Sequence, residues 1–545
     1  MLKKLSLYLQ TVKCMKVSQI WHRLRKKMRL SCSLGVQPAA MPERERISPI
    51  FTLQELDFDP VFLARFPAQE FLAGRITFLY EVQEFGWFEK WCFPNHSSLW
   101  NFNVHYFEYL FSLIQNWKYG KNPSALEQIK TCIRGWIDSN PQNEGGSGWE
   151  SYTIAMRLVN WLGCYAALET EIWKDWRFAQ RMIASIYEQY VYLSNHLEKD
   201  LLANHYFADL EALILCAIFF NDEKILKAAQ AEFRNQCAEQ ILQDGMHCEL
   251  SPMYHKIVFE GVLRVAAVLR HADMADKEIE AYIQPMLNAA YSLEEGLERV
   301  PLFNDCGDNV AKSLNALALA AKRYFGLVPE YKEQLPSSGY YMFKQGEWKL
   351  IVDAGAPGLR YNPGHAHCDA MSFELFRKGK PVLVNCGTYA YQCPERSYFR
   401  STAAHNTVQA EGVEQSQCWG VFRLGKRSSV RVIQHDDRGI EMLMHDQKGT
   451  QIQRRILFET DTLLVEDYSN GCRLNTYVHI LDDLDAVEKN TWRIGLHGRL
   501  MFECSETEIE ESAYAADYGK KQQIMMIKAA GEGISMRICF NDKDK

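Results

Sequence analysis

The sequence predicts a mixed α+β chain in which a helical domain precedes an antiparallel β-sandwich. Between about residues 100 and 325, apolar residues recur at three- and four-residue steps, as on the buried faces of helices. After Pro336 the pattern changes to short runs rich in Val, Ile, Phe and Tyr, which are typical of strands. Helices followed by strands, without alternation, argue against a parallel α/β sheet.

Helical periodicity is clearest in four segments: 101–117, 151–168, 204–220 and 252–271. Regular helices joined by short polar loops predict paired hairpins, which either stack as a solenoid or close into a toroid. Strands are predicted at 340–352, 371–376, 381–384 and 454–466, with a turn at 377–380. At 545 residues the chain is too long for one core. We therefore divide it into a basic helical arm (1–50), a helical domain (51–335) and a β-sandwich (336–545).

Composition excludes several classes of protein. A net charge of -7 provides no basic field of the kind that nucleic-acid binding requires, so no nucleic-acid partner is expected. The 16 cysteines are scattered without a C-x-x-C pair, and the opening segment has no apolar core or cleavage site typical of an export signal. The longest apolar run, 212–220, is far too short to span a membrane. These features predict a cytoplasmic protein with reduced thiols.

The first thirty residues carry nine Lys or Arg residues and no Asp or Glu. Their apolar residues fall near one helical face: Leu5, Leu9, Val12, Ile20, Leu24 and Met28. Two interpretations stay open. The arm is either an interfacial helix that contacts anionic lipid at the inner face of the membrane, or a helix packed on the body with a solvated basic face.

Two segments of the helical part contain polar, titratable residues at the start of a predicted helix. Asn204 and His205 open a strongly apolar helix, where Asn204 would also serve as a simple N-cap. Ser251 followed by Pro252 predicts a helix start with Tyr254 in its first turn. The positive end of that helix would favour a phenolate, although a packed tyrosine is the alternative.

Two segments of the sandwich part are rich in histidine. His365 and His367 are two residues apart, so in an extended chain they point to opposite sides and would do different jobs. Further on, the basic pair Arg396 and Arg400 precedes His405.

Six segments resemble signatures of the heparinase II/III-like polysaccharide lyases and occur in the family's order: 100–107, 149–161, 204–210, 251–255, 364–369 and 405–407. The resemblance covers roughly residues 85 to 430. It implies an incomplete (α/α) toroid followed by an antiparallel β-sandwich. It also implies β-elimination at a uronic acid, with an acidic polysaccharide or oligosaccharide as substrate.

The resemblance implies roles for individual residues. Asn204 would neutralise the uronate carboxylate with His205 as a helper, Tyr254 would act as base, acid or both, and His365 would supply the second proton-transfer group. A nearby cation, with Arg400 the first choice, would lower the pKa of Tyr254. The candidate substrate-binding residues are His105, Tyr106, Trp149, Arg157, Glu249, Arg396 and Arg400.

Some members of the family hold a metal ion, at positions that correspond to His367, Asn385 and His405. Asn385 departs from the family's aspartate, and an amide is a poor zinc ligand beside histidine. The chemistry itself requires no cofactor. A zinc-like divalent ion would be structural and would hold the loops that carry His365.

Two other functions fit the same residues. A uronyl C5-epimerase needs the same carboxylate neutralisation and proton abstraction, and a non-catalytic carbohydrate-binding protein could use the same scaffold. The sequence does not identify the polymer. Without an export signal, a surface polysaccharide made by the same cell, or an imported oligosaccharide, is the expected substrate.

Overall fold

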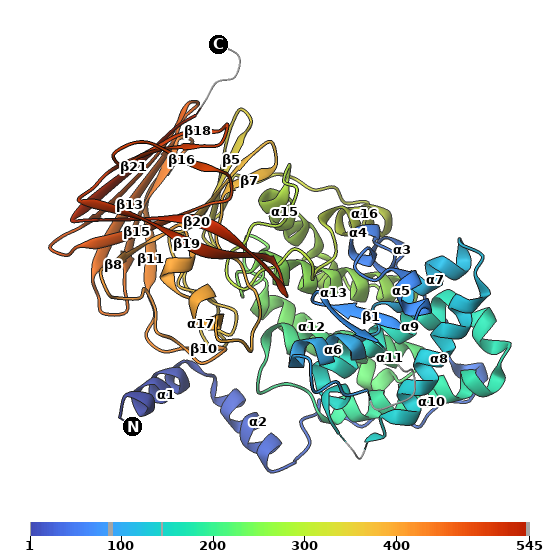
Figure 1. The fold of residues 1–545 in the computed structure, drawn as a ribbon. Coiled ribbons are helices and arrows are strands. Elements are labelled where there is room, and N and C mark those ends of the chain that lie inside the picture. Colours follow the sequence, from blue (N-terminus) through green and yellow to red (C-terminus); the bar gives the residue numbers. More distant parts are fainter. Residues whose placement is uncertain (1, 85–90, 143–144, 541–545) are drawn as a thin grey trace.

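The computed structural model describes residues 2–84, 91–142 and 145–540. Figure 1 shows the helical domain beside the β-sandwich, with the arm along one side. The helices of the arm and the start of the helical domain are α1 (Leu2–Cys14), α2 (Val17–Lys27), α3 (Gln54–Asp57), α4 (Pro60–Leu63) and α5 (Ala68–Leu72). A small hairpin of β1 (Arg75–Phe78) and β2 (Glu81–Glu84) follows.

Paired helices make up the rest of the helical domain. They are α6 (Ser98–Tyr106), α7 (Leu110–Lys118), α8 (Pro123–Ser139), α9 (Ser151–Trp173), α10 (Trp176–Asn195), α11 (Ala203–Phe219), α12 (Glu223–Gln240), α13 (Pro252–His271), α14 (Lys277–Glu280), α15 (Ile283–Glu294) and α16 (Leu314–Phe325). Helices α9, α11 and α13 pack side by side, and α10 and α12 cover them. Since α11 and α13 are buried on almost every side, they form the inner layer of an incomplete toroid.

Two antiparallel sheets form the sandwich. The eight-stranded sheet has the order β11-β12-β13-β14-β21-β18-β17-β16, and the nine-stranded sheet has the order β19-β20-β15-β7-β6-β5-β4-β3 with β8 beside β15. Their apolar inner faces form one core between the sheets. Burial alternates along β14, because successive side chains point to opposite faces of the sheet and only one face meets the core.

The bounds of the strands are as follows. They are β3 (Gln334–Leu335), β4 (Tyr340–Gln345), β5 (Trp348–Asp353), β6 (Phe373–Arg377), β7 (Lys380–Leu383), β8 (Val408–Ala410), β9 (Cys418–Trp419), β10 (Arg423–Leu424), β11 (Ser429–Asp436), β12 (Gly439–His445), β13 (Gln451–Phe458), β14 (Thr462–Ser469), β15 (Leu474–Ile480), β16 (Leu484–Glu488), β17 (Thr491–Ile494), β18 (Gly498–Glu503), β19 (Glu506–Asp517), β20 (Lys520–Gly531) and β21 (Gly533–Phe540). A short helix, α17 (Arg396–Phe399), lies in the long loop between β7 and β8.

The predicted order of helices before strands is confirmed, and so is the turn between β6 and β7. Three predicted elements are wrong in extent. The helix predicted at 101–117 is two helices, because Phe107 adopts a left-handed backbone conformation (φ 64°) after α6. The strands predicted at 340–352 and 454–466 are each a hairpin of two strands. A continuous apolar run does not reveal a tight turn inside it.

The two domains meet where the β19–β20 hairpin reaches the toroid (Figure 1). At its tip, the Tyr518 backbone N–H donates to the side chain of Asn309, in the loop between α15 and α16. Gly519 (φ 85°) lies directly against the Leu79 carbonyl, where any side chain would collide. The hairpin and the α15–α16 loop thus bring distant parts of the chain together between the two domains.

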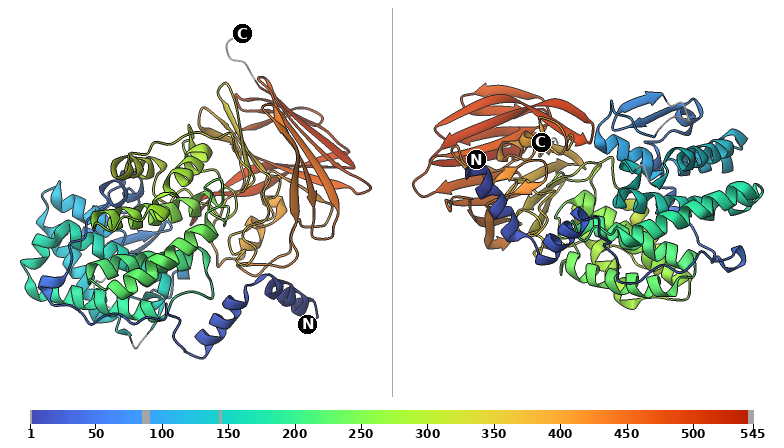
Figure 2. Two further views of the ribbon diagram at one scale, coloured as in Figure 1. Left: turned by 180° about the vertical axis from the view of Figure 1, so that it is seen from behind. Right: turned by 90° about the horizontal axis from the view of Figure 1, so that it is seen from below.

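No helix among the residues that the structure describes is both long and apolar enough to cross a membrane. The arm instead consists of two short helices on one side of the molecule (Figure 2).

Candidate active site

Asn204 lies in the first turn of α11, behind two residues with unusual backbone conformations. Leu202 and Ala203 have positive φ angles of 61° and 52°, which non-glycine residues adopt only at a cost. The Asn204 side chain is buried, yet its Oδ1 atom has no hydrogen-bond partner among the described residues. A buried amide with an unpaired polar atom is costly unless a ligand completes it.

His205 follows on the same helix and is paired with an acidic residue. Its Nδ1 atom lies 2.7 Å from Glu198 Oε2, and its ring packs on Tyr152 with centroids 4.6 Å apart. Burial opposes a charge on the imidazole, but the Glu198 carboxylate raises the pKa of His205 above its usual value. The side chain is 35% exposed, so it can present a positive charge to a substrate.

Tyr254 occupies the first turn of α13. Ser251 caps this helix, since its hydroxyl accepts the Tyr254 backbone N–H. The Tyr254 and Tyr391 hydroxyls are 2.7 Å apart, and the Tyr391 and Tyr518 hydroxyls are 2.8 Å apart. A chain of three phenols therefore joins α13, the β7–β8 loop and the β19–β20 hairpin.

The surroundings of Tyr254 favour the protonated form of its hydroxyl. Burial, the Tyr391 hydroxyl and the Asp305 carboxylate all raise the pKa of Tyr254 well above its usual value. The expectation that Arg400 lowers this pKa is wrong, because its guanidinium donates to the backbone carbonyls of Ala366, Gly420 and Val421. Arg400 instead supports the backbone next to His365.

Asp305 is the centre of a network of charged and polar side chains that includes His365, His367 and Arg396. It lies in the α15–α16 loop with no exposed surface. Its carboxylate accepts from His365 Nδ1 (3.0 Å), His367 Nε2 (2.8 Å) and both terminal nitrogens of Arg396. Although burial alone would raise the pKa of Asp305, Arg396 and the two histidines hold it well below its usual range.

His365 is the histidine of this network whose side chain keeps some exposed surface. Its side chain is 11% exposed, and its ring packs against that of Tyr254, with centroids 3.9 Å apart and the ring planes tilted by 32°. Because Nδ1–H donates to the Asp305 carboxylate, Nε2 carries the lone pair. An acceptor nitrogen held beside a protonated phenol can exchange protons with a bound substrate.

Arg396 was predicted to bind substrate, and the structure gives it a different neighbour. It is buried, pairs with Asp305, and lies over the Tyr391 ring at 5.1 Å. The two arginines, one helical turn apart, thus make different internal contacts. Arg396 pairs with the Asp305 carboxylate, and Arg400 donates to backbone carbonyls.

His105 and Arg157 also have internal roles in place of the predicted contact with substrate. Trp136 Nε1–H donates to His105 Nδ1 (2.9 Å), and burial lowers the pKa of His105 to about 3. Arg157 has no exposed surface and donates to the Gly148 carbonyl and the Gln189 side chain. Neither side chain can reach a polymer in this conformation.

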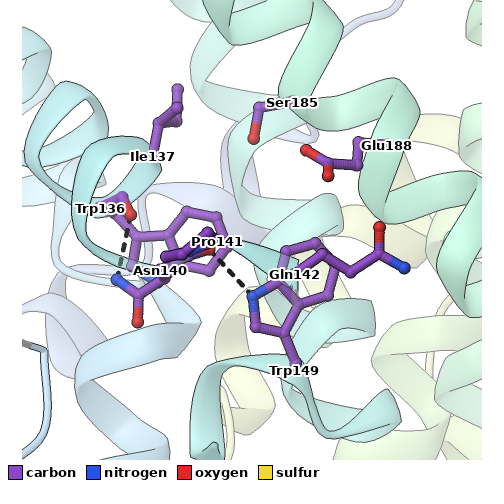
Figure 3. A pocket seen from close by; sticks show the side chains of 8 residues that line it. All are labelled: Trp136, Ile137, Asn140, Pro141, Gln142, Trp149, Ser185 and Glu188. Atoms are coloured by element: carbon purple, nitrogen blue, oxygen red, sulfur yellow. Dashed lines mark hydrogen bonds between the residues drawn. The ribbon is translucent and has the colours of Figure 1, made fainter. Parts of the chain in front are cut away.

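The remaining predicted substrate contacts divide between two places. Tyr106 packs edge-on against Tyr152, next to His205. Glu249 is buried, and neither of its carboxylate oxygens has a hydrogen-bond partner among the residues that the structure describes. Burial raises the pKa of Glu249, while the nearby His365 and His205 oppose that rise. Trp149 instead lines a separate cavity of about 530 Å³ with Trp136, Gln142 and Glu188 (Figure 3).

Comparison with known proteins agrees with this architecture. The model of the heparinase II/III N-terminus matches residues 58–332, and that of the heparinase II/III-like C-terminal domain matches residues 328–541. The chain belongs to the heparinase II/III family.

Characterised relatives of this family member are distant. It is 24% identical to the heparin-sulfate lyase of Pedobacter heparinus, over 42% of this chain and 39% of that protein. It is 18% identical to the heparin-sulfate lyase of Bacteroides thetaiotaomicron, over 60% of this chain and 54% of that protein. The chain thus spans less than two thirds of the length of the curated relatives that it matches.

Solved structures share the fold of this heparinase II/III family chain. A heparinase III structure aligns with a TM-score of 0.68 at 14% identity, covering 94% of this chain and 88% of that one. The heparan sulfate lyase HepC of Pedobacter heparinus aligns with a TM-score of 0.58 at 17% identity, covering 97% and 88%. These similarities establish the incomplete toroid and the sandwich.

The metal position that this family implies can be tested on the histidine geometry. His405 Nδ1 is 2.9 Å from the Ser401 carbonyl and His367 Nε2 is 2.8 Å from Asp305, so both nitrogens carry their protons. The two facing nitrogens, 3.1 Å apart, then both present lone pairs, and a bound cation would satisfy both. Donors already oriented by a carbonyl and a carboxylate are typical of metal ligands.

The third candidate ligand in this group is a carboxylate. Ligand atoms of His367, Asp369 and His405 all lie within 4.8 Å of one another. Asn385 was predicted for this role, but its amide oxygen accepts the Asn406 backbone N–H (3.0 Å). The structure thus puts Asp369 in its place, and two histidines with one carboxylate suit a zinc-like ion.

His405→Ala tests the metal position directly. Purified wild-type protein is expected to hold about one zinc per chain, and the variant close to none, with a lower melting temperature. His445→Ala, which removes a histidine of β12 far from this group, is the matched control. Elemental analysis and thermal unfolding provide the readouts. Metal-free wild-type protein that chelators do not destabilise would contradict the assignment.

Sequence analysis missed five residues of the site: Glu198, Asp305, Asp369, Tyr391 and Tyr518. Asp369 follows His367 by two residues in the sequence and could have been chosen as the acidic ligand. Asp305 stands in the polar run 304–309 between two apolar segments, which was the available signal. Tyr391 and Tyr518 lie in loops without any distinguishing pattern.

Proposed function

We propose that this chain is a polysaccharide lyase that cleaves a uronic-acid-containing, glycosaminoglycan-like polymer by β-elimination. The single observation that carries the proposal is the contact between the Tyr254 and His365 rings, in which the phenol can donate a proton and the imidazole presents an acceptor nitrogen. The relatives named as heparin-sulfate lyases support the reaction class.

The first requirement of the reaction is a neutralised uronate carboxylate, because the C5 proton is otherwise too weakly acidic. Asn204 offers a buried amide with an unused polar atom, and His205 offers an imidazolium maintained by Glu198. Both lie at the start of α11. Together they would stabilise the enolate-like charge that develops on the carboxylate.

The second requirement is a base for the C5 proton and an acid for the O4 leaving group. The lone pair on His365 Nε2 suits the base, and Asp305 would stabilise the imidazolium that forms. Tyr254 begins as a neutral phenol, so it suits the acid at O4. The hydroxyls of Tyr391 and Tyr518 would then help to return a proton to Tyr254.

A metal ion at His367, Asp369 and His405 would have a structural part in this site. When bound, it would supply a fixed positive charge that holds the segment carrying His365. His367 shares Asp305 with His365, so the ligand group and the catalytic pair are joined through one carboxylate.

Elimination leaves a C4–C5 double bond conjugated with the carboxylate, which absorbs in the near ultraviolet. Heparan sulfate, chondroitin sulfate and unsulfated uronic-acid polymers should be incubated with the enzyme in parallel. We expect rising absorbance and falling chain length with at least one polymer. Exchange of the C5 hydrogen with solvent deuterium, without new absorbance, would show an epimerase. Retention on a polymer column with neither signal would show a binding protein.

We also propose that the enzyme works in the cytoplasm, on a polymer that the cell makes or imports. All 16 cysteines are free thiols, and Cys368 and Cys418 remain unbonded although their sulfur atoms are 3.6 Å apart. Such thiols persist in a reducing compartment. Fractionation of the native host, with an antibody against the chain, would reveal an exported protein if the proposal is wrong.

A further inference from the structure

The arm of residues 2–30 contains an unusual concentration of exposed apolar side chains. Among the described residues, 24 large hydrophobic side chains are exposed, and nine of them lie between Leu5 and Leu30. A surface this apolar in so short a segment marks a contact site.

Helix α2 turns its polar side toward the protein and its apolar side away. Gln19 is its buried residue, 2% exposed, and its amide donates to the Leu201 carbonyl at 3.3 Å. Its outward side carries four exposed apolar side chains, which we call the apolar stripe. They are Val17 (83% exposed), Trp21 (54%), Leu24 (48%) and Met28 (56%). Positions separated by three and four residues share one helical face, so these side chains form a continuous stripe.

Helix α1 has the same polarity. Its inward side is held by Thr11, whose hydroxyl donates to the Leu424 carbonyl (3.1 Å) and accepts from Trp419 Nε1–H (3.2 Å). Leu5, Leu9 and Val12 are exposed by 56, 56 and 45%. The arm is therefore docked on the body through polar contacts, and its apolar side stays uncovered.

Basic residues flank the stripe, and the arm contains no acidic residue that could pair with them. Residues 1–30 contain nine Lys or Arg and no Asp or Glu. Lys13, Lys27 and Arg29 are exposed and form no ion pair with any described residue. Arg23 and Lys26 reach toward Glu198 and Asp200 only at 3.8–3.9 Å.

We propose that this arm docks on the surface of an anionic lipid bilayer. The stripe of Val17, Trp21, Leu24 and Met28 would enter the boundary between headgroups and acyl chains, where tryptophan is favoured. The flanking cations would remain at the level of the phosphates, with their aliphatic stems along the stripe. A purely apolar protein partner would not explain a basic segment without one acidic residue.

Docking would also orient the catalytic cleft. Tyr8 of α1 packs on Trp419, in the β9–β10 hairpin, at 4.7 Å between ring centroids. Phe422, in the turn of the same hairpin, contacts the rings of Tyr391 (5.1 Å) and His365 (6.4 Å). Figure 1 shows α1 directly beside β10. A bilayer that holds the arm would thus lie one hairpin away from the cleft, which suits a substrate assembled at the membrane.

Co-sedimentation of the full chain with vesicles tests the proposal. The vesicles are phosphatidylcholine alone, or phosphatidylcholine with about a third phosphatidylserine. We expect at least about tenfold tighter binding to the anionic vesicles, and loss of that difference at high salt. Equal binding to both vesicles, binding that salt does not weaken, or no binding would each overturn the proposal.

Three variants separate the stripe from the charges. Trp21→Ser with Leu24→Ser should abolish sedimentation with either vesicle, and Lys13→Gln, Lys27→Gln and Arg29→Gln together should weaken anionic binding about a hundredfold. Trp176→Ser, which removes a tryptophan of equal exposure from α10, should bind like the wild type.

All of these side chains are exposed, so an unchanged melting temperature shows that the variants fold. If the stripe mediates self-association instead, wild-type protein will be dimeric without vesicles and the Trp21 variant monomeric. That result would also overturn the proposal.

Discussion

Tyr254→Phe is expected to lower turnover by about 10²- to 10⁴-fold, the range for loss of a positioned acid or base. The substitution removes one hydroxyl and its proton, while the ring can still stack on His365. Affinity for the polymer should change little, because the hydroxyl is placed for the transition state. The initial rate of near-ultraviolet absorbance with a cleaved polymer, measured across substrate concentrations, provides both values.

A matched control is available in the sandwich. Tyr477→Phe also removes a buried hydroxyl, which accepts from Gln409 at 2.9 Å, but it lies on β15 outside the cleft. It should retain wild-type turnover despite a modest loss of stability. Near-normal activity of the Tyr254 variant would refute its assignment as the proton donor.

Asp305→Asn is expected to reduce both stability and turnover. The carboxylate balances the buried Arg396 and accepts from His365 and His367. Breaking a buried ion pair by removing one partner costs about 3–5 kcal/mol. Because an amide can donate to His365 Nδ1, the variant would also favour the wrong tautomer, and turnover of the folded fraction should fall at least about 10²-fold.

The same variant has a distinct pH dependence. The folded pKa of Asp305 lies well below its usual value near 3.8, so its contribution to stability is fully present above about pH 5. That contribution disappears as pH falls through the folded pKa. Denaturant unfolding from pH 7 down to pH 3 should therefore show a loss in the wild type that is smaller in Asp305→Asn.

Asp467→Asn separates stability from chemistry. Asp467 forms an equally buried pair with Arg454, with N–O distances of 2.7 and 2.8 Å, inside the sandwich. Its loss should destabilise the chain by a similar amount, while the folded enzyme stays active. If Asp305→Asn behaves in the same way, then Asp305 is structural only.

Local patterns were enough to predict the elements that carry the site. The starts of α11 and α13 follow from apolar periodicity and, for α13, from the Ser251–Pro252 pair, so Asn204 and Tyr254 could be placed in first helical turns. These two placements succeed because side-chain direction within one element depends only on its own backbone geometry. The expectation that His365 and His367 point to opposite sides is wrong, because their segment is not an extended strand and both rings reach the Asp305 carboxylate.

Contacts between distant segments decided the rest. Asp305 precedes His365 by 60 residues and Arg396 by 91, and no spacing in the sequence indicates that a loop carboxylate will receive both. Whether Arg396 or Arg400 reaches it depends on how α17 packs, since both lie on the same short segment.

The sequence by itself determined the order of helices and strands, the candidate residues Asn204, Tyr254 and His365, and the basic amphipathic arm. Only the tertiary structure decided the surroundings that raise the pKa of Tyr254, the acidic centre at Asp305, Asp369 in place of Asn385 as the candidate ligand, and the outward apolar face of α2. The physical reason is that the periodicity of apolar residues depends only on the local backbone geometry of each helix or strand. Electrostatic environment and exposure depend instead on which distant surfaces are brought together.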